Sequence, residues 1–237
     1  MSEIFNIIKN SLRSNNFYIP SCKSYVKGCS LTVKQLQEFQ ELDSAFEYGF
    51  EKYVRFAILS DKVIFENLES TKQLLSTDKP FILNQIKMSQ ESNFLGLSLQ
   101  DYISGIKERY EITPLFQKTT EFKYNNLTIT FDINTFDNTK TISQDFLNIL
   151  ENNFSNSPDI ISFEIIKSLK SISFENTELN LKEVKLLKEL IDNVPASVIE
   201  TFNVYFRYIN DSTKKINTFK IKESDFVFNP TLELMLL

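Results

Sequence analysis

The chain has 237 residues, of which 42% are hydrophobic and 24% charged, with a formal net charge of −5; this composition is typical of a globular protein. The absence of histidine excludes Ser-His-Asp and Cys-His catalytic sites and His-based zinc or iron centres. The acidic balance argues against nucleic-acid binding, which needs a clustered basic face, and the four glycines form no phosphate-binding loop. We therefore expect no catalytic residue, no cofactor and no metal ion.

The lack of targeting signals and the cysteine usage together predict an intracellular protein. No apolar stretch approaches the roughly 20 residues of a membrane-spanning helix, and the first 16 residues lack a signal-peptide pattern. Cys22 and Cys29 have no histidine or further cysteine with which to close a zinc site. We expect them to be reduced structural thiols, although they could approach each other across a hairpin.

The first third of the chain predicts a hairpin surrounded by helices. Residues 4–12 show helical spacing of apolar side chains, and residues 17–20 and 24–27 are extended runs on either side of a turn. Thr32 is a natural N-cap for the next helix. Helical patterns then cover residues 33–58, and Asp61 is expected to cap a short turn that ends at residue 68.

The remaining segments alternate helices with two further extended pairs. Residues 71–88 predict a helix with a new start at Asp78-Lys79-Pro80, and residues 97–110 predict a weaker one. Residues 119–124 and 127–133 alternate polar and apolar side chains around Asn125-Asn126, a strong hairpin signal. After an irregular stretch at 134–140, further elements are expected in this order: helices at 143–154, 159–170, 181–193 and 196–209, then extended runs at 218–221 and 226–228.

These elements predict an α+β fold that is predominantly helical, with small β-hairpins near the N-terminus, in mid-chain and near the C-terminus. The Asn- and Ser-rich stretch at 152–158 is the only plausible boundary. It divides the chain into regions 1–154 and 155–237, unless the two form one continuous domain.

Aromatic residues crowd two short segments, 46–56 and 202–208. One helix cannot turn all of them toward a single core, because successive side chains are about 100° apart. Each ring therefore either belongs to a larger core or is exposed for a partner, since aromatic residues are enriched at interfaces. Together with two rings near the C-terminus they are our candidate interaction residues: Phe46, Phe50, Tyr53, Phe56, Phe202, Tyr205, Phe206, Tyr208, Phe226 and Phe228.

Carboxylates are the remaining basis for an enzyme. Glu108 and Glu111 flank Arg109-Tyr110, and Asp132 lies in the central hairpin. Acids three residues apart on a helix normally belong to a solvated face, and none of these has supporting phosphate-binding residues. A magnesium-dependent carboxylate enzyme is therefore one alternative, and a single-stranded nucleic-acid binder that stacks bases on aromatic rings is another.

Three blocks of sequence occur in a recognisable order. The first is Tyr18-Ile19-Pro20-Ser21, Tyr25-Val26 and Leu31-Thr32-Val33-Lys34-Gln35; the second is Leu74-Leu75-Ser76-Thr77-Asp78-Lys79-Pro80-Phe81-Ile82-Leu83; the third covers 186–195 and 198–208. An acidic–Phe–x–Phe ending follows at Ser224-Asp225-Phe226-Val227-Phe228. This order resembles the baseplate-hub family of T4-like tailed phages, which includes hub subunits and hub assembly factors.

The resemblance has departures as well as implications. Some members of that family carry Cys-x-x-Cys pairs, but residues 121–126 and 207–213 contain no cysteine, so a metal-binding role is not carried over. Asn84-Gln85-Ile86-Lys87 also stands where many relatives have a Leu-Arg pair. The resemblance implies a non-catalytic protein that binds other baseplate hub or tail proteins, without nucleic acid or membrane. Such a protein occurs in the host cytoplasm during assembly, and also in the virion if it is a structural subunit.

Overall fold

The computed structural model describes residues 15–45, 47, 49–90, 96–113, 119–152, 160–175, 177–178, 184–221 and 224–227. The helix predicted over residues 4–12, the apolar tail at 232–237 and two candidate interaction residues, Phe46 and Phe228, lie outside these ranges.

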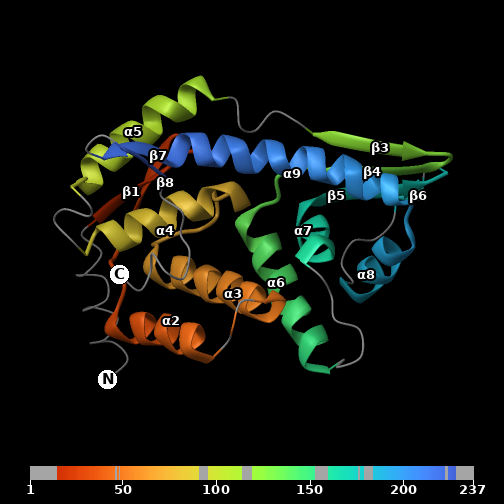
Figure 1. Ribbon diagram of the computed structural model, residues 1–237, viewed down its shortest axis with the longest axis horizontal. Helices are drawn as coiled ribbons and strands as arrows, with labels where there is room; N and C mark the ends of the chain where they lie inside the picture. Colours follow the sequence, from red (N-terminus) through yellow and green to blue (C-terminus); the bar gives the residue numbers. More distant parts are fainter. Residues whose placement is uncertain are drawn as a thin grey trace.

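The described chain is a predominantly helical α+β structure with small antiparallel sheets, which confirms the predicted fold class (Figure 1). Its helices are α2 (Val33–Ala45), α3 (Phe50–Asn67), the 3₁₀ helix η1 (Ser76–Asp78), α4 (Lys79–Met88), α5 (Leu99–Ile112), α6 (Phe136–Asn152), α7 (Ile160–Ser168), α8 (Val184–Asn193) and α9 (Ala196–Asn217). Its strands are β1 (Asn15–Ile19), β2 (Ser24–Gly28), β3 (Thr120–Tyr124), β4 (Leu127–Phe131), β5 (Leu169–Phe174), β6 (Thr177–Glu178), β7 (Thr218–Ile221) and β8 (Ser224–Val227).

All three predicted extended pairs are present as antiparallel hairpins: β1–β2, β3–β4 and β7–β8. Lys23 in the first turn and Asn125 in the central turn have φ of 51° and 53°. These lie in the left-handed region that tight turns require and that asparagine adopts readily. Thr32 also caps α2 as predicted, because its hydroxyl accepts a hydrogen bond from Gln35 N at 3.2 Å.

The prediction of a helix over residues 159–170 is wrong at its end, where β5 begins at Leu169. In the sheet of order β3-β4-β5-β6, Ile172 of β5 is paired with Ile129 of β4, and both are buried. This segment is a strand because it pairs with β4, about 40 residues earlier in the chain, and local periodicity does not reveal such pairing. The sheet joins residues on both sides of the expected boundary at 154.

Four further details differ from the prediction. Asp61 lies inside α3 and is buried, so it does not cap a turn. The stretch at 134–140 is mostly helical: α6 begins at Phe136, where the Thr135 hydroxyl accepts a hydrogen bond from Asn138 N. Residues 71–75 precede η1 rather than forming a helix. Helix α9 continues past residue 209 to Asn217, because its polar last turns are still anchored by the buried Ile216.

The core has three parts. The largest lies between the four-stranded sheet and helices α3 and α6 to α9; the second joins the N-terminal hairpin to α2, α3 and α4; the third joins α4 and α5 to the end of α9 and β7. Helix α9 links the first part to the third, since it contacts β3 near one end and α5 near the other (Figure 1).

Candidate functional site

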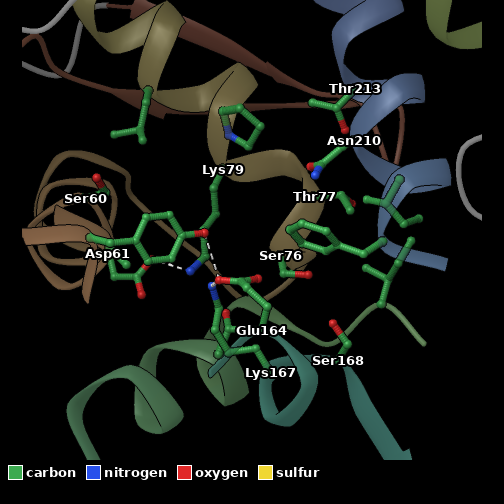
Figure 2. A pocket seen from close by; sticks show the side chains of 18 of the residues that line it. Ser60, Asp61, Ser76, Thr77, Lys79, Glu164, Lys167, Ser168, Asn210 and Thr213 are labelled. Atoms are coloured by element: carbon green, nitrogen blue, oxygen red, sulfur yellow. Dashed lines mark hydrogen bonds and ion pairs between the residues drawn. The ribbon is translucent and has the colours of Figure 1, made fainter. Parts of the chain in front are cut away.

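A cavity of about 290 Å³ lies between α3, the η1–α4 segment, α7 and α9 (Figure 2). Its wall contains both charged groups and aromatic rings. The charged side chains are Asp61, Lys79, Asp132, Glu164 and Lys167, and the rings are Tyr53, Phe56, Tyr205 and Phe206. Because four elements far apart in sequence build this wall, the cavity exists only in the folded chain.

Lys79 and Asp61 form a buried ion pair in the cavity wall. Lys79 Nζ lies 2.5 Å from Asp61 Oδ1, and the two side chains are 14% and 1% exposed. Burial lowers the pKa of Lys79, although the Asp61 carboxylate opposes this shift. Lys79 Nζ also lies over the ring of Phe136, 5.4 Å from its centre. A pair buried in this way keeps its charge only while both partners are present.

Glu164 is the centre of a second group. Its Oε1 accepts hydrogen bonds from the Tyr53 hydroxyl at 2.9 Å and from Lys167 Nζ at 2.8 Å. Burial and the neighbouring carboxylate raise the pKa of Tyr53 far above its usual range, so this hydroxyl remains a donor. Part of the Tyr53 ring is exposed, but its hydroxyl is held against the buried Glu164. Figure 2 shows Asp61, Lys79, Glu164 and Lys167 close together at the centre of the site.

Several polar atoms of the wall are buried without a hydrogen bond from any residue that the structure describes. They are the hydroxyls of Ser60 and Thr77 and both carboxylate oxygens of Asp61, of which Oδ1 has its ion contact with Lys79. Ser60 and Thr77 are each more than nine-tenths buried. An unsatisfied buried polar group costs about 1–3 kcal/mol, so these atoms lower the stability of this part of the fold.

Asp78 holds the segment that carries Lys79 in place. Its carboxylate accepts hydrogen bonds from Ser21 N at 3.0 Å, from the Ser21 hydroxyl at 2.5 Å and from Leu75 N at 2.8 Å. Asp78 is fully buried, and this burial raises the pKa of its carboxyl although the three donors oppose the shift. The Asp-Lys-Pro sequence thus ties the N-terminal hairpin to the start of α4 and fixes one wall of the cavity.

The predicted interaction residues lie mostly in the core, which is one of the two alternatives that the sequence left open for these rings. Phe202 and Tyr205 are buried against Phe131, with ring centres 5.5 and 6.1 Å from it. Phe50 and Phe206 are partly buried against the same core, and Phe56 is partly buried against the second part of the core. The remaining described members are Tyr53, in the cavity wall, Tyr208, partly exposed on α9, and Phe226, in register with Phe219 of β7. A sheet on one side and helices on the other give these rings the larger core that a single helix cannot offer.

The sequence did not single out the two most exposed aromatic rings of the sheet, Tyr124 and Phe174. Register places Tyr124 opposite Leu127, and Leu127 opposite Phe174, so the three form one row across β3, β4 and β5. We call this the sheet-tip row. Its two rings are 50% and 51% exposed. Tyr124 lies in the predicted hairpin, but Phe174 lies in β5, whose first two residues were predicted as helix and whose other residues were assigned to no element.

The candidate carboxylates do not converge. Glu111 lies 3.8 Å from Lys23 on the surface, and Asp132 lies 2.7 Å from Lys170. Hydrogen bonds from Lys170 and the Ile133 amide lower the pKa of Asp132, outweighing the effect of its partial burial. Within the described ranges, no group of three or more acidic or cysteine side chains is placed to hold a metal ion, and no helix is long and apolar enough to span a membrane. Cys22 is exposed and Cys29 is buried, and no disulfide joins them.

Comparison of the chain with family models, with curated proteins and with solved structures finds no match.

Proposed function

We propose that the protein is a non-catalytic binding protein, a component or assembly factor of the baseplate hub of a T4-like tailed phage, that acts through contacts with other tail proteins. The observation that carries this proposal is the sheet-tip row. It continues the apolar face formed by Phe122, Ile129 and Ile172, which are buried. The face therefore extends past its covering helices and leaves two aromatic rings half exposed at its end.

The sheet tip is pre-organised for binding. Glu175 N donates a hydrogen bond to Asn126 O at 3.0 Å, which ties the β5–β6 turn to the β3–β4 turn. Both turns lie at the far right of Figure 1, where the hairpin reaches the edge of the molecule. Aromatic side chains held on a rigid backbone lose little entropy on binding and are common at interface centres. The sheet tip thus offers a partner an apolar centre with a polar rim.

The resemblance supplies the identity of the partner. Its first two blocks contact each other in the fold through Ser21 and Asp78, and its third block covers most of α8 and half of α9. These blocks thus have structural roles in this chain, which leaves the binding surface to be found elsewhere, at the sheet tip.

Affinity purification of the full chain with the hub and tail proteins of a T4-like phage tests this function. We expect a hub protein to copurify, and the double variant Tyr124→Ala/Phe174→Ala to weaken its binding at least tenfold. Ile112→Ala is the matched control, because Ile112 is an exposed apolar residue at the end of α5. Failure of the native chain to bind any tail protein would overturn the proposal, as would unchanged binding of the double variant.

Two further variants complete the experiment. Phe202→Ala is expected to lower stability by about 3–5 kcal/mol, because it empties a core position, so reduced binding by this variant reports unfolding. Mass spectrometry of purified particles then separates the two roles, since a structural subunit is retained in the virion and an assembly factor is not.

A further inference from the structure

We propose that the free edge of the four-stranded sheet pairs with the same edge of a second copy of this chain. In this dimer the two β3 strands are antiparallel, the twofold axis passes through Phe122, and Glu121 of each copy lies opposite Lys123 of the other. The contact joins two sheets of order β3-β4-β5-β6 into one continuous sheet. The inference goes beyond the proposed function, because it concerns the edge of the sheet and requires no tail protein.

Strand β3 is an edge strand with outward-pointing backbone groups. Tyr124 and Leu127 close its hairpin with β4 across a two-residue turn, so these two residues exchange hydrogen bonds. Hydrogen-bonded and non-hydrogen-bonded residues alternate along an antiparallel ladder, so the N–H and C=O groups of Glu121 and Lys123 point away from β4. Within the described ranges, neither residue makes a backbone hydrogen bond on that outer side. Figure 1 shows β3 along the upper right margin of the molecule.

The N-terminal hairpin shows how this protein closes other strand edges. The N–H and C=O groups of Tyr18 in β1 are both hydrogen-bonded to the Gln85 side chain, at 2.6 and 2.9 Å. On the outer side of β2, Lys27 O accepts a hydrogen bond from Glu69 N. At the opposite end of the four-stranded sheet, β6 has only two residues. Strand β3 has five residues, a regular register and no proline, and a long open edge of this kind is suited to pairing with another strand.

Backbone geometry and charge together select one register for the pair of β3 strands. Outward-pointing residues must lie opposite outward-pointing residues, so the registers with most overlap are centred on Glu121, Phe122 or Lys123. A register centred on Glu121 or on Lys123 places like charges opposite each other, which is unfavourable. The register centred on Phe122 places Glu121 opposite Lys123 and pairs all five residues of β3. Its two hydrogen-bonded pairs exchange two bonds each and so form four hydrogen bonds.

The side chains of this edge are also available for the contact. Glu121 and Lys123 lie on the same face of β3, with Oε2 and Nζ 3.1 Å apart and with side chains 51% and 69% exposed. An ion pair this exposed contributes little by itself, whereas the second copy converts it into a square of four alternating charges. On the other face of β3 the half-exposed Tyr124 lies opposite Thr120 of the second copy. The contact is self-complementary, so it closes with two copies.

Sedimentation of the full chain at several concentrations, without any tail protein, tests this assignment. One pair of strands forms a smaller contact than a standard interface, so we expect a monomer–dimer equilibrium with a Kd on the order of 10–100 µM. The amides of Glu121 and Lys123 should exchange with deuterium severalfold more slowly at high concentration than at low concentration. The amide of Phe122 already bonds to β4 and should change little. A chain that remains monomeric up to about 1 mM would overturn the proposal.

Charge reversal tests the register. Glu121→Lys places lysines opposite each other in both ion-pair positions, and Lys123→Glu places glutamates there, so each variant alone should self-associate at least tenfold more weakly. An equal mixture of the two variants restores opposite charges in both positions, so it should form heterodimers as tightly as the native chain forms dimers. Glu41→Lys is the control, because it makes the same charge change on the exposed surface of α2, away from the sheet. Circular dichroism checks that all three variants fold.

The possible outcomes separate this inference from the proposed function. A dimer that neither reversal weakens, or in which the amides of Glu121 and Lys123 are not protected, uses another surface and overturns the assignment. If these amides become protected only in a complex with a tail protein, the edge binds a strand of that partner: the second copy is excluded and the proposed function stands. If the chain dimerises as described but binds no tail protein, this inference stands and the proposed function fails.

Discussion

The link between Ser21 and Asp78 offers the sharpest test of how this fold is held together. Ser21→Ala removes one hydrogen bond of 2.5 Å to a buried carboxylate, and hydrogen bonds to charged groups contribute about 1.5–3 kcal/mol. Asp78→Ala removes three hydrogen bonds and leaves Ser21 N and Leu75 N without their acceptor. Relief from burying the carboxylate offsets part of this loss, so we expect about 3–4 kcal/mol.

Urea unfolding followed by circular dichroism measures both effects, and the double variant completes a thermodynamic cycle. The coupling energy between Ser21 and Asp78 should be about 1.5 kcal/mol, and Ser21→Ala should lower Tm by roughly 4–8 °C for a chain of this length. Ser44→Ala is the control, since its hydroxyl also accounts for one hydrogen bond, to Glu41 O at 3.0 Å, but on the exposed surface. A cost below about 0.5 kcal/mol for Ser21→Ala, or no coupling energy between Ser21 and Asp78, would show that this pair of residues does not hold the N-terminal hairpin to α4.

Two further predictions concern a close contact and a buried hydroxyl. Gly28→Ala should destabilise the protein by about 2–3 kcal/mol, because the added Cβ would lie 2.6 Å from the Phe17 ring. Gly49→Ala is the control: its added Cβ meets no atom closer than 3.9 Å, so thermal melts should show almost no change in stability. Burial raises the pKa of Tyr102 far above 10, so above pH 10 the unfolded chain loses the phenolic proton first and stability falls as pH rises. Tyr102→Phe should cost about 1–2 kcal/mol at pH 8, because it removes the buried hydrogen bond from the Tyr102 hydroxyl to Asn217. Urea titrations should show this deficit shrinking by about 1 kcal/mol between pH 10 and 11, and a deficit that stays constant over this range would contradict the explanation.

Local sequence determined the turns and caps of this protein. Turn and cap residues act through their own backbone preferences or through neighbours within about three residues. Examples are Asn125 in a two-residue turn, Thr32 at a helix start and Pro80 in the first turn of α4. Their effects are therefore readable without the fold, and the three hairpins and most helix starts lie where these residues predict them. The local sequence does not predict the wall of the cavity, because no sequence pattern around Asp61 and Lys79 distinguishes them from charged residues on the surface.

By itself, the sequence determined the class of fold, the three hairpins and the exclusion of histidine chemistry, since composition and short-range backbone preference are local properties. Only the tertiary structure decided which aromatic rings are buried, that residues 169–174 form a strand, and that five charged side chains line one cavity. Phe202 and Tyr205 are buried because a sheet built from both halves of the chain covers them, and Tyr124 and Phe174 are half exposed because that sheet extends beyond its helices. Burial depends on which distant segments pack together, and a single segment does not contain that information.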